Sequence, residues 1–369
     1  MDASVNRIQS SEEERTLLLS LRLNNKNITE VKYSLEELKL LAKTAGAIVV
    51  RSKIINRDRI NAAFIVGQGY LEQIKKIIKE NNIKLIIFDL NTTRPAQIRN
   101  LEDFLKCRVI GRTEIILDIF AKRAKSAEAK VQIELAQLKY LLPRLKGLGD
   151  VLSRLGGGIG TRGPGEKMLE SDRRHLNRRI LVLRKKLLKF QEHRARTRSS
   201  RSDQFLGSVV GYTNAGKSTL INVLAKDDLF VEDRLFATLD SYTRTVFLSP
   251  HKKALLTDTV GFIRNLPANL VESFKSTLED IQNSDFIIHV VDLNSFDLET
   301  NIFTVNKELE EMNCLDKPII LFFNKSDLLK DDKKIDFINS EYPKSIVGSM
   351  KTLAGVEKLK KRILDLYSI

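Results

Sequence analysis

A glycine-rich octapeptide, Gly211 to Ser218 with the sequence GYTNAGKS, constrains the fold of this chain more than any other segment. The apolar run Phe205–Val210 before it has strand character, and Thr219–Ala225 after it has helical spacing. A strand, a G-x-x-x-x-G-K-S loop and a helix in this order form a phosphate-binding loop, whose backbone N–H groups wrap a phosphate at the helix N-terminus. A glycine-rich turn that arose by chance would not be expected between a strand and a helix. The segment therefore predicts a nucleotide-binding α/β domain with a mostly parallel sheet.

The chemistry of phosphate binding assigns roles within this loop. Lys217 is expected to reach the β- and γ-phosphate oxygens, and the Ser218 hydroxyl to coordinate Mg²⁺. Asn214, three residues before Lys217, suits either a K⁺ ion near the phosphates or a hydrogen bond that braces the loop. The predicted loop contacts are Gly211, Tyr212, Thr213, Asn214, Ala215, Gly216, Lys217 and Ser218.

Two further segments complete the phosphate side of the site. Asp258, Thr259, Val260 and Gly261 follow Ala254–Thr257, which has the pattern of a buried strand. Asp258 can hold the Mg²⁺ shell through water, and the Gly261 N–H can sense a γ-phosphate. Between the two motifs lies the expected first switch, in which Thr238 is the second Mg²⁺-coordinating hydroxyl; its residues are Phe236, Ala237, Thr238, Leu239 and Asp240. The predicted catalytic residues are Lys217, Thr238 and Gly261.

A base-reading element follows another apolar run, Ile319–Phe323, and consists of Asn324, Lys325, Ser326 and Asp327. The Asp327 carboxylate can accept from the ring N–H and the exocyclic amine of guanine, a donor pair that adenine does not present. Asn324 would brace the loops, and the Lys325 stem could cover the face of the base. Alone, N-K-S-D also fits a surface turn; third in order after the other motifs, it predicts a GTPase domain over residues 203–369.

A last base-contacting loop is expected at Ser349, Met350 and Lys351. Met350 stands where such loops often have a small residue. Because the contact to guanine is made by a backbone N–H, we expect the larger side chain to be tolerated.

Phe262 follows Gly261 directly, at the position where many small signalling GTPases have a Gln that orients the attacking water. A phenyl ring can neither donate nor accept a proton. We therefore expect slow intrinsic hydrolysis, with the water positioned by switch backbone or by a partner.

Residues 1–112 are expected to form a separate small α/β domain. Strand-like apolar runs and segments with helical spacing alternate along it. The strands are Thr16–Leu23, Gly46–Val50 and Leu85–Asp89; the helices are Leu35–Ala45, Gly67–Lys79 and one starting near Pro95. The Gly67-Gln68-Gly69 turn fits an ordinary strand-to-helix turn as well as a nucleotide loop.

Residues 113–200 have the pattern of an antiparallel helical hairpin with a glycine-rich tip at 156–165. Two apolar stripes with spacings of three and four predict its helices: Val131, Leu135, Leu138, Leu142 and Leu145, then Leu169, Leu176, Ile180, Leu183, Leu187 and Phe190. The tip suits either a flexible turn or a loop that conforms to nucleic acid. Residues 199–202 are the expected hinge into the GTPase domain.

The second hairpin helix is strongly basic, and the whole chain of 369 residues has a formal charge of +15. Such a run is either a solvated face or a surface for a polyanion, and the scarcity of balancing acids past Asp172 favours phosphate contact. No aromatic residues interleave with the charges, so recognition of RNA shape and backbone is expected. The predicted RNA-binding residues are Arg162, Arg173, Arg174, Arg178, Arg179, Lys185 and Lys186.

Cysteine content and hydropathy indicate the cellular compartment in which the protein is expected to work. The two cysteines, Cys107 and Cys314, form no metal-ligand cluster, which is typical of a reducing compartment. Met1–Ser4 does not begin a signal sequence, and no apolar run approaches the ~18 residues of a membrane span. We expect a cytoplasmic monomer, with peripheral membrane association as an alternative.

Several segments together resemble the HflX family of ribosome-associated GTPases. The most specific are Gly157–Glu166 and Leu169–Arg174; Gly211–Ser218, Phe236–Asp240 and Asp258–Arg264 agree with them, and the resemblance covers nearly the whole chain. It implies binding to the large ribosomal subunit, splitting or rescue of stalled ribosomes in the GTP state, and hydrolysis stimulated by ribosomes. It also implies that the glycine-rich tip approaches ribosomal RNA near the peptidyl transferase centre.

The chain departs from the family pattern in places. Lys167-Met168 stands where members usually have Thr-Gln. Many members continue into a small C-terminal domain beyond the position of Ile369, so we expect functions that need it to be affected. ATP use by the N-terminal domain is proposed in the family, but no second phosphate loop supports it here. Two alternatives stay open: a ribosome-assembly GTPase, and a nucleotide-gated adaptor whose hairpin binds another protein.

Overall fold

The computed structural model describes residues 14–24, 27–152, 164–199, 204–226, 235–236, 238–239, 242–264, 279–329 and 333–367. For residues 145–152, 164–169, 195 and 197–199 only the backbone is described. The chain divides into two compact units, residues 1–119 with 146–155 and residues 120–145 with 156–369. Three predicted site residues, Arg162, Ala237 and Asp240, lie outside the described residues, as do most of the glycine-rich tip and the expected hinge.

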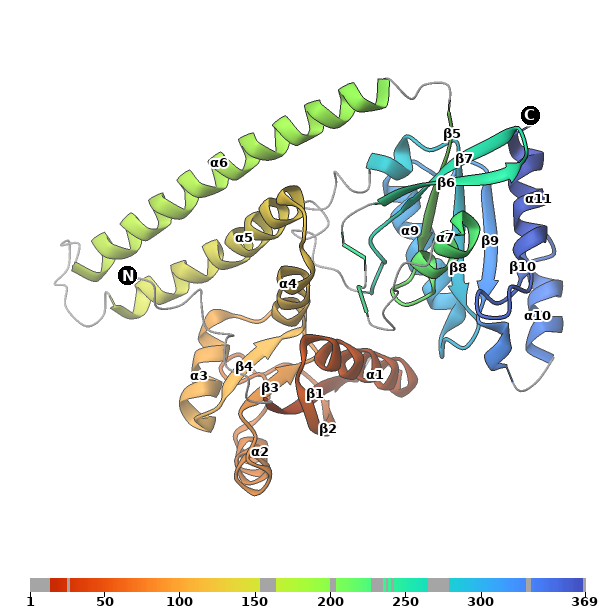
Figure 1. Cartoon of the computed structure of the whole chain (residues 1–369). Helices are drawn as coiled ribbons and strands as arrows, with labels where there is room; N and C mark the ends of the chain where they lie inside the picture. The colour runs from red at the N-terminus through yellow and green to blue at the C-terminus, as the bar shows by residue number, and fades with distance from the viewer. Residues whose placement is uncertain are drawn as a thin grey trace. The chain divides into compact units, whose positions relative to one another are not determined.

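The first unit is built on a four-stranded parallel sheet with the order β2-β1-β3-β4 (Figure 1). The strands are β1 (Arg15–Leu23), β2 (Ile48–Arg57), β3 (Leu85–Phe88) and β4 (Arg108–Gly111). Helices alternate with them: α1 (Ile28–Ala45), α2 (Gln68–Asn81), α3 (Pro95–Leu105) and α4 (Arg112–Arg123). All four residues of β3 are buried, as expected for a parallel strand covered on both faces.

Local signals set several of these boundaries. The Asn27 side chain accepts from the Thr29 N–H at the start of α1, and Gly46 ends that helix in the left-handed region at φ 94°. Pro95 is the first residue of α3, where its missing N–H costs no hydrogen bond.

The predicted α/β organisation of this region is confirmed. Two boundaries differ by seven residues: α1 begins before the predicted Leu35, at Ile28, and β2 continues to Arg57 rather than ending at Val50. The prediction did not single out β4, because a four-residue strand has too few positions to show a period.

The helices α5 (Ala127–Leu152) and α6 (Pro164–Ser199) form the predicted hairpin, and α5 is assigned to the second unit as far as Leu145. Leu135, Ile180 and Leu183 are buried between them, with Val131, Leu138, Leu142 and Leu187 packed against these three. Glu128 pairs with Arg194, and Glu134 with Arg179, so residue numbers rise along one helix as they fall along the other. The two helices are therefore antiparallel.

The GTPase region has a six-stranded sheet with the order β10-β9-β8-β5-β7-β6, in which only β6 is antiparallel to its neighbour. The strands are β5 (Phe205–Gly211), β6 (Tyr242–Ser249), β7 (Lys252–Asp258), β8 (Phe286–Asp292), β9 (Ile319–Asn324) and β10 (Ile346–Val347). The described helices are α7 (Lys217–Ala225), α9 (Leu298–Glu311), η2 (Ser326–Leu328), α10 (Lys333–Glu341) and α11 (Val356–Tyr367).

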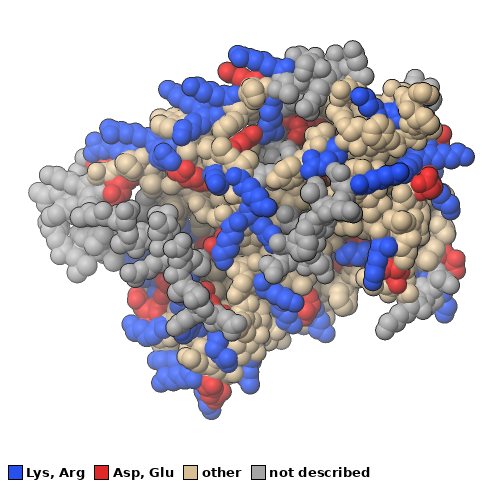
Figure 2. All heavy atoms as spheres, in the orientation of Figure 1, with Lys and Arg blue, Asp and Glu red and all other residues tan. Residues whose placement is uncertain are grey.

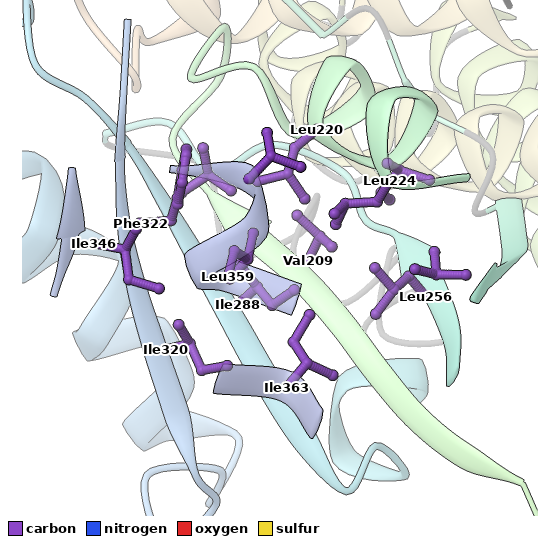
Figure 3. Packing of buried hydrophobic residues seen from close by; sticks show 14 of the residues in the cluster. Val209, Leu220, Leu224, Leu256, Ile288, Ile320, Phe322, Ile346, Leu359 and Ile363 are labelled. Atoms are coloured by element: carbon purple, nitrogen blue, oxygen red, sulfur yellow. The ribbon is translucent and has the colours of Figure 1, made fainter. Parts of the chain in front are cut away.

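The largest described hydrophobic cluster of this region lies between the sheet and two helices, and smaller clusters involve α9 and α10. Val209, Leu256, Ile288 and Phe322 from the strands point toward Leu220 and Leu224 of α7 and toward Leu359 and Ile363 of α11 (Figure 3). This packing fixes the sheet under the phosphate loop. The α/β fold class with a mostly parallel sheet is confirmed, and no described helix is long and apolar enough to cross a membrane.

Candidate nucleotide-binding site

The predicted motifs meet at one edge of the six-stranded sheet. The strands β5, β7, β8 and β9 are parallel neighbours, so their carboxyl ends lie side by side. A cavity of about 410 Å³ opens at this edge. The phosphate loop and α7 line it through Thr213, Asn214, Gly216, Lys217, Ser218 and Thr219. The other motifs supply Phe236, Thr238, Gly261, Asn324, Lys325, Asp327, Leu328, Ser349, Met350 and Lys351.

Glycine is required at two positions of the phosphate loop. Gly216 has φ 96°, and a Cβ there would lie 2.2 Å from Nδ2 of Asn324. A Cβ on Gly211 would lie 2.2 Å from the backbone oxygen of Val290. The helix α7 begins at Lys217, two residues before the predicted Thr219, so its N-terminus lies at the cavity. Unpaired N–H groups at a helix N-terminus favour a phosphate.

Lys217 lies at the floor of the cavity and is only 6% exposed. Its Nζ donates to the backbone oxygens of Gly211 at 3.2 Å and of Tyr212 at 3.0 Å. Burial lowers the pKa of Lys217 to about 8, although the nearby Asp258 carboxylate acts in the opposite direction. An ammonium with so little solvent favours an anionic ligand.

Three oxygen-bearing side chains meet beside Lys217. Oδ2 of Asp258 accepts from the Ser218 hydroxyl at 2.6 Å and from the Thr238 hydroxyl at 2.8 Å, and the two hydroxyl oxygens are 2.6 Å apart. Burial raises the pKa of the Asp258 carboxyl, and among the described residues its buried Oδ1 has no hydrogen-bond partner. Hydroxyl and carboxylate oxygens are hard ligands of the kind that Mg²⁺ prefers. The cluster therefore fits the predicted Mg²⁺ site.

The base-reading side is tied together through Asn324. Its Nδ2 donates to the Ala215 backbone oxygen at 2.9 Å, and its Oδ1 accepts from the Met350 N–H at 3.1 Å. The Ser349 hydroxyl donates to Oδ1 of Asp327 at 2.5 Å. The bracing predicted for Asn324 is thus present. The Met350 side chain is accommodated in the hydrophobic core of the sheet, with 4% exposure.

Phe262 points away from the cavity. Its N–H donates to the Gly211 oxygen, and its own oxygen accepts from the Thr213 N–H, which ties the segment after Gly261 to the phosphate loop. The side chain is 6% exposed and packs with Val210 and Ile281. Because the ring is held in the core, it contributes no group to the cavity.

The remaining predicted contacts lie beside the cavity rather than along its wall. The Thr259 hydroxyl donates to the backbone oxygen of Val209 at 2.7 Å, and the Tyr212 hydroxyl accepts from the Arg264 N–H at 2.8 Å. These contacts position the loops. Other predicted residues that do not line the cavity are Gly211, Ala215, Leu239, Asp258, Val260 and Ser326.

Two residues at the end of β8 contact the site but were not predicted. Asp292 pairs with Lys325, and Asn294 donates to the Lys325 backbone oxygen. The available signal was Asp292 and, two residues later, Asn294, at the end of the run Phe286–Val291, which is apolar except for His289. Without knowing that β8 lies next to β9, that signal could not be connected to the base-reading loop.

Apart from Arg162, which lies outside the described residues, the predicted RNA-binding residues lie along α6. Arg173, Arg174, Arg178, Lys185 and Lys186 are exposed. Arg179 instead forms a two-pronged pair with Glu134 of α5, at 2.6 and 2.9 Å. Lys and Arg side chains gather along the upper left of the space-filling view, where α6 lies in Figure 1 (Figure 2).

Comparison with protein-family models matches three regions of the chain. A model described as 50S ribosome-binding GTPase matches residues 207–325. Models described as GTP-binding GTPase N-terminal and GTP-binding GTPase Middle Region match residues 32–121 and 123–201.

Comparison with whole proteins extends these matches over most of the chain. It is 46% identical over 336 residues to the GTPase HflX of Caldanaerobacter subterraneus subsp. tengcongensis, covering 90% of this chain and 77% of that protein. It is 40% identical over 337 residues to the GTPase HflX of Escherichia coli, covering 90% and 79%. A crystal structure of a GTP-binding protein from Sulfolobus solfataricus in complex with GDP is similar with a TM-score of 0.51 and 26% identity, covering 96% and 99%.

Proposed function

The chain belongs to the HflX family of GTPases, and from this premise we propose that its nucleotide cycle controls binding to the large ribosomal subunit and the splitting or rescue of stalled ribosomes. The proposal of a guanine-nucleotide cycle is supported by one cavity. It is lined on one side by Ser218 and Thr238, which contact Asp258, and on the other by Asn324 and Asp327. The proposal of ribosome binding is supported by the exposed basic face of α6. The GTPase works in the cytoplasm as a monomer.

In this proposal each wall of the cavity has its own part in GTP binding. Lys217 holds the β- and γ-phosphate oxygens together with the N–H groups at the start of α7. Ser218 and Thr238 would hold Mg²⁺, with Asp258 acting through water. A bound Mg²⁺ would neutralise charge that develops on the phosphate oxygens. Asp327 reads the guanine edge, and the Ser349–Lys351 loop lies beside it, held by the Met350 N–H that donates to Asn324.

The position of Phe262 supports slow hydrolysis by the protein alone. No side chain at this position reaches the cavity to orient a water, because the ring packs against Val210 and Ile281. The attacking water is then positioned by the Gly261 backbone or by the ribosome. Binding to the large subunit is therefore expected to accelerate hydrolysis.

The test compares GTP hydrolysis by the protein alone and with purified large ribosomal subunits, at fixed Mg²⁺ and K⁺ and with ATP in parallel. The expected result is a low rate that rises when subunits are added, with no comparable use of ATP. A rate that is indifferent to subunits would remove the ribosome from the proposal. Accumulation of precursor subunits in cells lacking the protein would instead favour ribosome assembly.

The basic face of α6 is tested by replacing Arg178, Lys185 and Lys186 with Gln, leaving Arg179 and its hairpin contact in place. Each lost contact to an RNA phosphate makes the slope of log binding constant against log salt concentration less steep by about 1. We expect weaker subunit binding with unchanged GTP affinity. A matched control replaces Lys358, Lys361 and Arg362, which are exposed on α11, with Gln. Equal losses in both variants would indicate a nonspecific effect of charge.

A further inference from the structure

An ion pair at the end of β8 holds the base-reading loop from outside the four residues of that motif. Oδ2 of Asp292 lies 2.8 Å from Nζ of Lys325. Nδ2 of Asn294 donates to the Lys325 backbone oxygen at 2.9 Å. Oδ1 of Asp292 accepts from the Asn294 N–H at 2.8 Å, so the two contacts form one connected network.

The register of the sheet explains why these residues meet. Asp292 is the last residue of β8 and pairs with Asn324, the last residue of β9, so Lys325 follows directly at the same edge. Lys325 has φ 66°, a left-handed conformation that costs a non-glycine residue about 1 kcal/mol. Contacts to both the side chain and the backbone of Lys325 favour this conformation.

Lys325 also lines the nucleotide cavity. Its ammonium and the Asp292 carboxylate are 24% and 23% exposed, so the pair is neither fully buried nor a freely solvated surface contact. Fixing the ammonium at Asp292 restricts where the four-carbon stem can lie, since a Lys side chain otherwise samples many rotamers.

We propose that Asp292 is a positioning residue for guanine-nucleotide binding, which anchors the Lys325 ammonium so that the Lys325 stem covers the face of the purine ring. This inference rests on the guanine site proposed above and assigns to that site a residue outside its sequence motif. Asp327 reads the edge of the base, whereas Asp292 acts on the face through Lys325. Asn294 supports the same arrangement through the Lys325 backbone.

Because Asp292 acts on the face of the base and Asp327 on its edge, their variants should differ in how they change GTP and ITP binding. Contact with the ring face does not involve the exocyclic amine, so loss of Asp292 should weaken GTP and ITP binding by the same factor. Loss of Asp327 should instead reduce the preference for GTP over ITP, because its carboxylate accepts from that amine. Anchoring a flexible side chain before binding is worth about 0.5–1.5 kcal/mol, or about 2- to 12-fold in affinity.

The experiment measures release of fluorescent GDP and steady-state hydrolysis for the full-length protein and for Asp292→Asn, Lys325→Met and the double variant. We expect GDP release about 3- to 10-fold faster in Asp292→Asn, a KM for GTP raised by a similar factor and an unchanged kcat. Lys325→Met keeps the stem but loses the ammonium, so the double variant should be no worse than the worse single variant. Asp292→Glu, which retains a carboxylate, should recover most of the loss.

Asp316→Asn, an exposed charge change elsewhere in the same domain, is the matched control and should leave GDP release unchanged. The proposal is overturned by unchanged GDP release in Asp292→Asn, by full additivity of the two single variants, or by a larger loss for GTP than for ITP. Urea unfolding of each variant separates these effects from a general loss of stability. Failure of the wild-type protein to bind GDP would instead overturn the proposed function.

Discussion

Each of the two sheets of this chain has an aspartate at the carboxyl ends of its parallel strands, and the two aspartates differ in how their carboxylate oxygens are paired. In the first unit, Asp89 follows β3, and its two oxygens are bound by Arg112 at 3.0 Å and Ser20 at 3.0 Å. Arg112 also pairs with Glu37 and is 1% exposed. In the GTPase region, Asp258 ends β7 beside a cavity of about 410 Å³, and one of its carboxylate oxygens has no hydrogen-bond partner within the described part of the chain.

The difference shows what turns a sheet edge into a ligand site. Ligands of open α/β sheets bind beyond the carboxyl ends of the strands, and both edges meet that condition. At the first edge the protein supplies its own cation, which satisfies the carboxylates. At the second edge, Gly261 leaves room beside Lys217 and Gly216 leaves room beside Asn324, and no described cation is paired with the free oxygen of Asp258, so this edge suits a bound ligand.

The largest effect is expected from Arg112→Met. Removing one partner of a buried ion pair leaves uncompensated carboxylates and costs about 3–5 kcal/mol. We expect faster amide hydrogen exchange in β1, β3 and β4, with GTP affinity unchanged. Arg108→Met is the control, because Arg108 is 42% exposed and pairs with Glu14 at 3.4 Å. Wild-type exchange in Arg112→Met would show that the pairing does not stabilise this sheet.

Gly216→Ala is expected to lower GTP affinity about 100-fold, a size typical of losing well-placed contacts to a charged group. The added Cβ would overlap Nδ2 of Asn324, and φ 96° is strained for alanine, so the phosphate loop must move. Isothermal titration with GDP and GTP measures the loss. Gly69→Ala is the control, since nothing lies within 4 Å of its Cβ position. Equal affinities of Gly216→Ala and wild type would refute the loop geometry.

Thr238→Ala is expected to raise the Mg²⁺ concentration needed for half-maximal GTP hydrolysis about 10-fold. The variant removes one of the two hydroxyls in the oxygen cluster around Asp258. Hydrolysis measured across a Mg²⁺ titration gives the shift, with Thr245→Ala on β6 as an exposed control. An unchanged Mg²⁺ requirement would exclude Thr238 as a ligand.

The smallest effect concerns His289, a second buried titratable group of the GTPase sheet. Burial lowers its pKa to about 3, with a further contribution from the Lys217 charge. Between that pKa and the value of about 6.5 in the unfolded chain, only the unfolded state binds the proton, so stability falls as pH drops below about 6.5. The loss from pH 6.5 to 5.5 is about 1 kcal/mol.

Urea unfolding at the two pH values, with His289→Phe for comparison, measures this contribution. The variant should lose less stability on acidification than the wild type. An equal loss in both proteins would assign the acid sensitivity to other groups.

Local sequence predicted much of the fold and of the candidate site. The phosphate loop could be recognised because each of its requirements, two glycines, a lysine and a hydroxyl at fixed spacing, falls within eight residues. The apolar stripes of the hairpin were equally readable, and Leu135, Ile180 and Leu183 are indeed buried there. Short strands such as β4 could not be predicted, because four residues are too few to show a hydrophobic period.

The sequence by itself determined that this chain builds a P-loop GTPase domain, an N-terminal α/β region and a basic helical hairpin. Motif order and hydrophobic period are properties of neighbouring residues and need no knowledge of the fold. Only the tertiary structure decided that Phe262 turns into the core, that Arg112 closes the edge of the first sheet, and that Asp292 reaches Lys325. Each of these depends on which strands are neighbours and which way a side chain points, and burial and pairing across distant segments set both.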